Sequence, residues 1–238
     1  MLTLPGAADG SLISTLAIGF LLGMRHALDG DHVAAVSTLV TGRRGPYAWC
    51  LVGGFWGIGH TVALLVAALA TRLAGLRIPR EVDKALEALV AMLVVALGAN
   101  VLRHALRGVR LHRHEHAHGG RSHRHLHVHL TSTASHSHVH AIGYGTRPLL
   151  MGALHGLAGS AALLLLVLAT MPSTLAALLY VAVFGAGSTV GMLLVSGLVG
   201  IPFVVGGSSD RARVGLRIAV GVASLGIGVA MLRSLLAG

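Results

Sequence analysis

Charged residues are scarce in this sequence, and their scarcity excludes a soluble globular domain. Asp, Glu, Lys and Arg make up 11% of the 238 residues, whereas soluble domains carry about a quarter. The mean hydropathy is correspondingly high, at +0.78. Cys50 is the single cysteine, so no internal disulfide can form. The sequence also lacks a glycine-rich phosphate loop, so this chain carries no ATPase site of that type.

Acidic residues are fewer than basic ones, 8 against 18, which gives a formal charge of +10. Such an excess can indicate a nucleic-acid partner. Here most of the arginines lie in loops between apolar runs, so we expect no nucleic-acid binding. Loops rich in Lys and Arg stay in the cytoplasm, and the distribution predicts both termini outside with the long central loop in the cytoplasm. The N-terminus has no basic segment before its first apolar run and does not resemble a cleaved signal peptide.

Six apolar runs are each long enough to cross a hydrocarbon core of about 30 Å. They lack the alternation of β-barrel strands, so they are expected to be helices. The expected fold class is an all-α integral membrane protein with six transmembrane helices. These cover about 12–40, 47–70, 85–106, 148–170, 174–200 and 214–236.

The two halves of the sequence resemble each other, with three blocks that recur at offsets of 129, 128 and 130 residues. The matched blocks are "GMRH" (23–26) with "GALH" (152–155), "GIGHTV" (57–62) with "GAGSTV" (185–190), and "LGANVLR" (97–103) with "IGVAMLR" (227–233). Each half holds three spans, an odd number, so the second half would enter the membrane from the opposite side. Many secondary transporters have such an inverted-topology repeat. We expect a 3+3 repeat formed by residues 1–107 and 147–238, with a His-rich loop, 108–146, between them.

Ionisable residues interrupt the first apolar run in "GMRHALDGDH" (23–32). An ionisable group inside a span costs roughly 2.5–3.5 kcal/mol on insertion scales and usually marks a functional path. His26, Asp29 and His32 would share one side of a regular helix. Gly30 is a poor helix former, and a break there would turn Asp31 inward. Asp29 could instead be only the counter-ion of Arg25.

Histidines in later spans extend this set. His60 lies between glycines in the second run, and His155 is the repeat equivalent of His26. Either could instead be an ordinary core histidine, and Asn100 in the third run could be a distant ligand or a contact between helices. Imidazoles and carboxylates together suit a divalent transition metal. The candidate metal ligands are His26, Asp29, Asp31, His32, His60 and His155.

The central loop holds 11 of the 16 histidines within residues 112–140, mostly at H-x-H spacing. Such tracts are typical of metal binding. The loop has too few apolar residues to fold by itself, so we expect it to be disordered without metal. It could trap, buffer or sense metal in the cytoplasm, or it could be a tolerated low-complexity linker.

The motifs resemble those of a known family. "RHALDGDH" (25–32), which contains H-x4-D-H, resembles the signature of the nickel/cobalt transporter superfamily, and "GFWGIGHT" (54–61) is similar to its second motif. "HGLAGSAAL" (155–163) and "FGAGSTVGMLL" (184–194), with "GIPF" (200–203), resemble the six-span, urease-accessory-type nickel permeases. The resemblance implies nickel or cobalt movement across a bacterial inner membrane, with His26, Asp31, His32 and His60 as ligands.

The resemblance also implies that the ion is cargo rather than a resident cofactor, that the chain is not an enzyme, and that it would take up Ni²⁺ or Co²⁺. Possible partners are a cytoplasmic metallochaperone or a urease or hydrogenase maturation pathway. Other hypotheses remain at this point. The His-rich loop resembles that of efflux proteins, so export is an alternative to uptake. An intramembrane metalloenzyme and a membrane-tethered metal store are two more.

Overall fold

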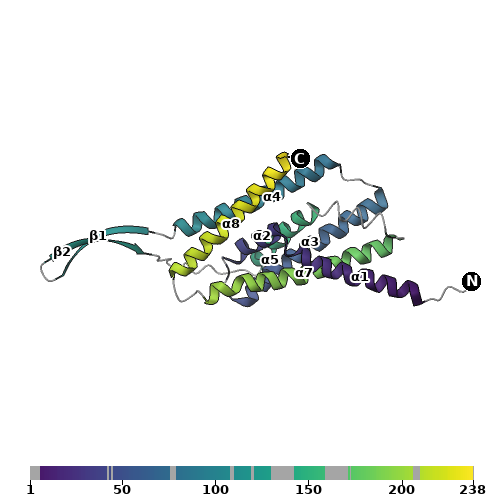
Figure 1. Ribbon diagram of the computed structural model, residues 1–238, viewed down its shortest axis with the longest axis horizontal. Helices are drawn as coiled ribbons and strands as arrows, with labels where there is room; N and C mark the ends of the chain where they lie inside the picture. Colours follow the sequence, from purple (N-terminus) through teal and green to yellow (C-terminus); the bar gives the residue numbers. More distant parts are fainter. Residues whose placement is uncertain are drawn as a thin grey trace, which may run out of the picture.

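A computed structural model describes most residues of the chain, and the fold and the site consist of those residues. They are 6–41, 43, 45–75, 79–107, 110–118, 121–129, 142–158, 171, 173–205 and 210–237. Within these ranges lie seven helices and one two-stranded hairpin (Figure 1). The elements are α1 (Gly6–His26), α2 (Gly30–Val40), α3 (Pro46–Ala74), α4 (Arg80–Arg107), β1 (Arg110–His118), β2 (Arg121–His129), α5 (Ile142–Leu157), α7 (Thr174–Val205) and α8 (Asp210–Ala237).

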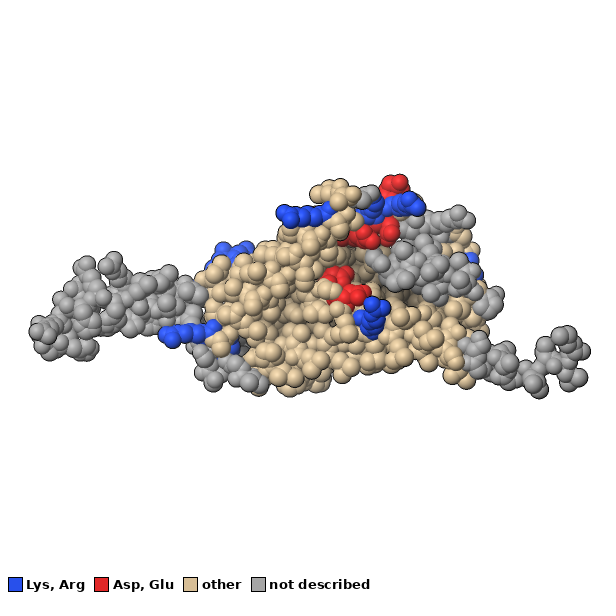
Figure 2. Space-filling view, in the orientation of Figure 1, with Lys and Arg blue, Asp and Glu red and all other residues tan. Residues whose placement is uncertain are grey.

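The helices confirm the all-α membrane fold. Four of them, α3, α4, α7 and α8, are long and apolar enough to cross a membrane, and the bent pair α1 and α2 could form a fifth span. Large apolar side chains such as Val62 and Val66 are exposed along them, as lipid-facing positions require. Figure 2 shows a largely uncharged belt with Lys and Arg mostly toward its margins. The expected span 148–170 is described only as far as residue 158, so the count of six spans stays a prediction.

Local sequence signals set the helix ends. Gly45 has a positive φ of 89° and is followed by Pro46 in the first turn of α3. Proline suits that position because its missing N–H has no partner there anyway. Gly75 ends α3 in the left-handed conformation, at φ 62°, which glycine adopts without steric cost. Thus α3 is bounded by two glycines, and the run between them is mostly apolar, with His60 near its middle.

The helices form two groups joined by α2. In one group α3 packs against α5 and α7, and α7 also packs against α1; in the other, α4 pairs with α8. The short helix α2 contacts α3, α4, α7 and α8. Figure 1 shows α4 and α8 running alongside the larger group, with α2 between. This placement brings the start of α2 next to α3 and α5.

Glycines set how closely α1 and α7 approach. A Cβ on Gly23 would overlap the backbone carbonyl of Phe184, and a Cβ on Gly187 would overlap the carbonyl of Phe20. Only glycine permits backbones this close, which is the usual reason for small residues at membrane helix interfaces. Reciprocal contacts therefore lock the two helices at two points.

The α3–α5 interface has the same reciprocal pattern. A Cβ on Gly152 would overlap the carbonyl of Trp56, and a Cβ on Gly59 would overlap that of Leu149. At the crossing of α3 and α7, the Oγ1 atoms of Thr61 and Thr189 lie 3.3 Å apart. The close crossings hold α3 firmly between its two neighbours.

Part of the His-rich segment lies among the described residues, and its expected disorder without metal stays a prediction. Residues 110–118 and 121–129 form an antiparallel hairpin that projects from the helical bundle (Figure 1). The physical reason lies in the sequence, because H-x-H spacing has the period of two that a β-strand requires. The remaining part of the tract, including His136, His138 and His140, lies outside the described residues.

Candidate metal site

The bent pair of helices α1 and α2 breaks where the charged residues of the first apolar run lie. Helix α1 ends at His26, α2 begins at Gly30, and the two are bent by 58°. Asp29 precedes α2 with extended backbone angles, φ −61° and ψ 143°, and its carbonyl accepts the Val33 N–H at 3.0 Å. The break predicted near Gly30 is therefore present, although Gly30 is the first residue of the second helix rather than the centre of the break.

Asp29 fixes the ring of His26. The His26 Nδ1 atom lies 2.8 Å from Asp29 Oδ2. An ionised carboxylate only accepts hydrogen bonds, so Nδ1 carries the proton and Nε2 keeps its lone pair. The His26 Nε2 atom is buried and has no hydrogen-bond partner. A carboxylate behind a histidine is the usual means of orienting a metal-binding imidazole.

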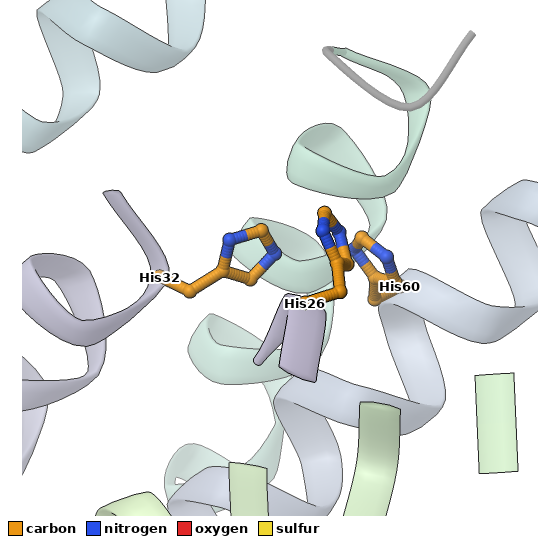
Figure 3. A group of neighbouring side chains, drawn as sticks. All are labelled: His26, His32 and His60. Atoms are coloured by element: carbon orange, nitrogen blue, oxygen red, sulfur yellow. The ribbon is translucent and has the colours of Figure 1, made fainter. Parts of the chain in front are cut away.

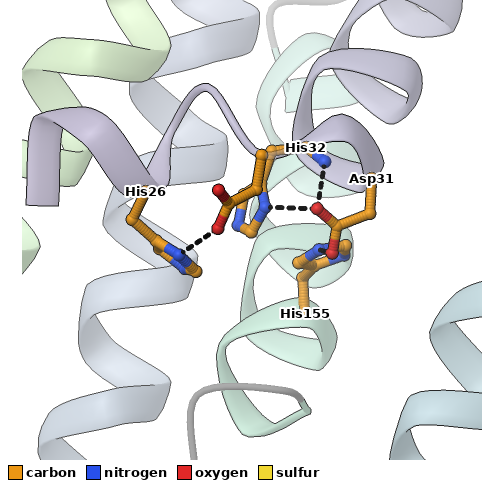
Figure 4. Close-up of polar contacts among 5 residues, drawn as sticks. His26, Asp31, His32 and His155 are labelled. Atoms are coloured by element: carbon orange, nitrogen blue, oxygen red, sulfur yellow. Dashed lines mark hydrogen bonds and ion pairs between the residues drawn. The ribbon is translucent and has the colours of Figure 1, made fainter. Parts of the chain in front are cut away.

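Asp31 plays the same part for two more histidines (Figure 4). Its Oδ1 accepts from the backbone N–H of His32 at 2.9 Å and from His32 Nδ1 at 3.0 Å. Its Oδ2 lies 2.8 Å from His155 Nε2. The carboxylate thus connects α2 to α5, and it leaves His32 Nε2 buried without a partner.

Three imidazoles converge next to this network. His26, His32 and His60 come from α1, α2 and α3, and one nitrogen from each lies within 4.8 Å of the others (Figure 3). Both nitrogens of His60 are buried without a partner. A metal with ligands at 2.0–2.1 Å holds its ligand atoms about 3 to 4.2 Å apart. Small inward rotations would therefore let the three rings, which we call the histidine triad, bind one ion.

A second group overlaps the histidine triad. Ligand atoms of Asp31, His32 and His155 also lie within 4.8 Å of one another, and the rings of His32 and His155 are 4.1 Å apart. We call this group the aspartate triad. His32 belongs to both triads, so every ligand arrangement that the described residues offer at this break includes it.

Exposure and charge both change across the site. The side-chain exposure falls from 56% for Asp29 to 25% for Asp31 and 2% for His32, and His60 is fully buried. The carboxylates therefore lie toward the surface, and the imidazoles lie deepest. Two carboxylates would balance the two positive charges of a divalent ion, which matters because an uncompensated buried charge is strongly unfavourable.

The structure brings five of the six predicted ligands into the two triads. Asp29 contributes to neither; its carboxylate contacts His26 instead. Among the described residues, no hydrogen bond or ion pair joins Asp29 to Arg25, so the counter-ion alternative has no support here. Asn100 is exposed and accepts a hydrogen bond from Arg103 at 3.0 Å, and it belongs to neither triad.

Two aromatic residues that are not among the predicted ligands lie beside the site. The ring of Trp56 lies 5.5 Å from that of His155, and the ring of Phe184 lies 5.5 Å from that of His26. Trp56 precedes His60 by four residues, which places both on one side of α3. Phe184 occupies the position equivalent to Trp56 in the second half. The sequence already contained both indications: the four-residue spacing between Trp56 and His60, and the repeat equivalence of Phe184 to Trp56.

Comparisons with known proteins agree with the motifs. Residues 12–237 match the NicO family model, described as a high-affinity nickel-transport protein. The chain is 36% identical over 205 residues to the urease accessory protein UreH of Bacillus sp. (strain TB-90), covering 84% of this chain and 82% of UreH. It is 39% identical over 72 residues to the cobalt transport protein NhlF of Rhodococcus rhodochrous, covering 28% of this chain and 19% of NhlF. No solved structure matches the chain.

The family match covers both halves of the chain, including the broken first span and every residue of the two triads. It confirms the resemblance that the H-x4-D-H motif predicted. The chain belongs to the NicO family of high-affinity nickel-transport proteins.

Proposed function

We propose that this chain takes up Ni²⁺ or Co²⁺ across a bacterial inner membrane through the histidine triad at the break of its first span. The observation that carries this proposal is the set of buried imidazole nitrogens without partners on His26, His32 and His60. Buried polar atoms are nearly always hydrogen-bonded. Several unpartnered nitrogens at one point are explained if a cation binds there, as cargo rather than as a resident cofactor.

The two carboxylates have separate parts in this proposal. Asp29 holds the proton on Nδ1 of His26, and Asp31 holds the proton on Nδ1 of His32, so both rings offer Nε2 to the ion. Asp31 and His155 form the adjoining aspartate triad together with His32, and this triad would accept the ion as it leaves the histidine triad. His32 would remain a ligand in both positions, which avoids releasing the ion completely between them.

The proposal includes six spans in a 3+3 inverted repeat. The glycine contacts support it, because the pair Gly23–Phe184 has its repeat equivalent in the pair Gly152–Trp56. The α4–α8 interface shows the same relation, because its glycine contacts match one another when the two halves of the sequence are exchanged. A Cβ on Gly98 would meet the carbonyl of Gly221, and one on Gly228 would meet the carbonyl of Ala91. Alternating movement of the two halves would then open the ion site to each side in turn.

Both termini outside and the His-rich loop in the cytoplasm complete the proposed topology. The relative named as a urease accessory protein suggests that the imported nickel supplies a cytoplasmic maturation pathway or metallochaperone. Transport needs no chemical conversion of substrate, so we propose no enzymatic activity.

The direction of transport is tested in cells that lack their own nickel exporters and importers. Cells expressing the chain should accumulate more ⁶³Ni²⁺ than cells with an empty vector, because the proposed direction is inward. Total cell nickel is the readout, with a variant carrying His32→Ala as the inactive control. Lower accumulation together with better survival at high nickel would instead show efflux.

Substitutions of Asp29 and Asp31 test the separate roles that we propose for the two carboxylates. Asp31→Asn should weaken Ni²⁺ binding by about 10- to 100-fold, the usual effect of losing an orienting carboxylate, because it removes charge and disturbs two histidines. Asp29→Asn should have a smaller effect, because an amide oxygen can still accept from His26 Nδ1. Isothermal titration of the purified protein measures the Ni²⁺ affinity of both variants. A larger loss for Asp29→Asn than for Asp31→Asn would contradict these assignments.

A further inference from the structure

Ser188 on α7 is a buried polar residue that the proposed transport site does not use. Its side chain is fully buried, at 0% exposure, and among the described residues its Oγ atom has no hydrogen-bond partner. Burying a hydroxyl without a partner is costly, and buried polar groups in proteins are nearly always hydrogen-bonded. The unpaired hydroxyl therefore points to a partner that is not part of the chain, such as an ion or a water bound to an ion.

Other hydroxyls of α7 are satisfied by their own helix. Thr189 donates to the Gly185 carbonyl at 2.8 Å, and Ser196 donates to the Leu193 carbonyl at 3.0 Å. Bonds of this kind, to a carbonyl three or four residues earlier, are the usual arrangement for serine and threonine inside helices. Ser188 has no such bond within the described chain, so its oxygen is free to accept.

Ser188 lies against α1 next to the histidine triad. A Cβ on Gly23 would come within 2.9 Å of the Ser188 backbone nitrogen, and Gly23 precedes His26 by about one helical turn. Phe184, whose ring lies 5.5 Å from that of His26, precedes Ser188 by four residues. Residues at this spacing share one side of a helix. The side of α7 that carries Ser188 therefore meets α1 beside His26.

The same turn of α7 also meets α3 beside His60. The helices cross where the Oγ1 atoms of Thr61 and Thr189 lie 3.3 Å apart, and these threonines are 128 positions apart in the sequence. His60 directly precedes the first threonine, and Ser188 directly precedes the second. Ser188 is thus the repeat equivalent of His60, and it adjoins two members of the histidine triad, one on α1 and one on α3.

We propose that the Ser188 hydroxyl accepts a hydrogen bond from a water on the ion in the histidine triad. Transition-metal ions in such sites have at least four ligands, and the histidine triad supplies three, so at least one position is left for water. A buried water needs two to four polar partners, and a serine oxygen has two lone pairs that can accept. The inference rests on the transport site proposed above and adds a positioning residue to it.

The position of Ser188 gives this contact a consequence for transport. Every member of the histidine triad belongs to the first half of the chain, whereas Ser188 belongs to the second. An ion in the histidine triad would therefore be held by both halves at once. Alternating access moves the two halves relative to each other, so that movement would make and break the water contact.

Replacing Ser188 with alanine separates this role from a purely structural one. The experiment uses the full-length protein with the histidines of residues 112–140 replaced by asparagine. Ser188→Ala should bind Ni²⁺ about 10-fold more weakly, the lower end of the usual effect of losing a residue that supports a metal ligand. Its Tm without metal should equal or exceed that of the parent protein, because alanine removes a buried hydroxyl that has no partner. Isothermal titration measures the affinity, and thermal unfolding in detergent measures the Tm.

Ser196→Ala is the matched control, because Ser196 is equally buried on the same helix but bonds its own helix. It should leave the Ni²⁺ affinity unchanged. Unchanged affinity in Ser188→Ala would overturn the proposal, and so would weaker binding accompanied by a clearly lower Tm, because damage to the fold would then explain it. Unchanged affinity in His32→Ala would instead overturn the transport site itself, so the two failures are distinguishable.

The visible absorption of bound Co²⁺ gives a second readout on the same proteins. The d–d bands of Co²⁺ respond to the number and geometry of its ligands, which differ between coordination types. Loss of a held water in Ser188→Ala should therefore change the Co²⁺ spectrum, while Ser196→Ala should keep the parent spectrum. An unchanged spectrum in Ser188→Ala would also overturn the proposal, since the ligands of the ion would then be the same without the hydroxyl.

Discussion

Replacing His32 with alanine is expected to abolish nickel binding at the proposed transmembrane site. His32 is the one residue common to the histidine triad and the aspartate triad, so its loss leaves neither with three ligands. Losing an orienting residue weakens metal binding by 10- to 100-fold, and loss of a ligand shared by two positions should exceed about 100-fold. Isothermal titration with Ni²⁺ measures this effect, in a background where the histidines of residues 112–140 are replaced by asparagine.

His104→Ala is the matched control for this substitution. His104 also lies on a helix, α4, but it is exposed and belongs to neither triad. Its replacement should leave the affinity unchanged. If His32→Ala folds, as judged by gel filtration and helical circular dichroism, and still binds nickel like the wild type, then the site has been assigned to the wrong residues.

Adding one methyl group at Gly187 is expected to destabilise the whole protein. A Cβ there would overlap the backbone carbonyl of Phe20, and a backbone atom cannot move aside without separating α1 from α7. Overpacking of this kind costs about 1–3 kcal/mol, and more where the backbone must shift. Thermal unfolding of Gly187→Ala in detergent should show a clearly lower Tm. The equivalent Gly59→Ala, whose Cβ would overlap the Leu149 carbonyl, should behave alike.

Gly197 provides the control on the same helix. Nothing lies within 4 Å of the position that its Cβ would take. Alanine is a better helix former than glycine by up to about 1 kcal/mol, so Gly197→Ala should keep or raise the Tm. Equal losses of Tm for Gly187→Ala and Gly197→Ala would contradict the close crossing of α1 and α7.

The sequence predicts the membrane fold and the position of the site because both depend on local pattern. Long apolar runs specify spanning helices, and the charged residues around Gly30, itself a poor helix former, favour a break there. The repeat also indicated His155, which has no carboxylate near it in sequence. These features follow from periodicity and from the cost of ionisable groups in lipid.

The parts of the site that sequence could not predict depend on tertiary contacts. Spacing alone suggested that Asp29 would share one side of a helix with His26 and His32, but after the break it lies toward the surface, where it contacts His26. The bridge from Asp31 to His155 joins residues 124 positions apart, which no local pattern reveals.

Nickel flux in proteoliposomes tests most directly whether the cluster at the helix break carries the ion. Purified wild type, His32→Ala and His104→Ala are reconstituted at equal density, and entry of ⁶³Ni²⁺ is followed with time. Wild type and His104→Ala should transport nickel at similar rates, while His32→Ala should not exceed protein-free vesicles. Transport by a folded His32→Ala protein at the wild-type rate would show that the ion crosses elsewhere.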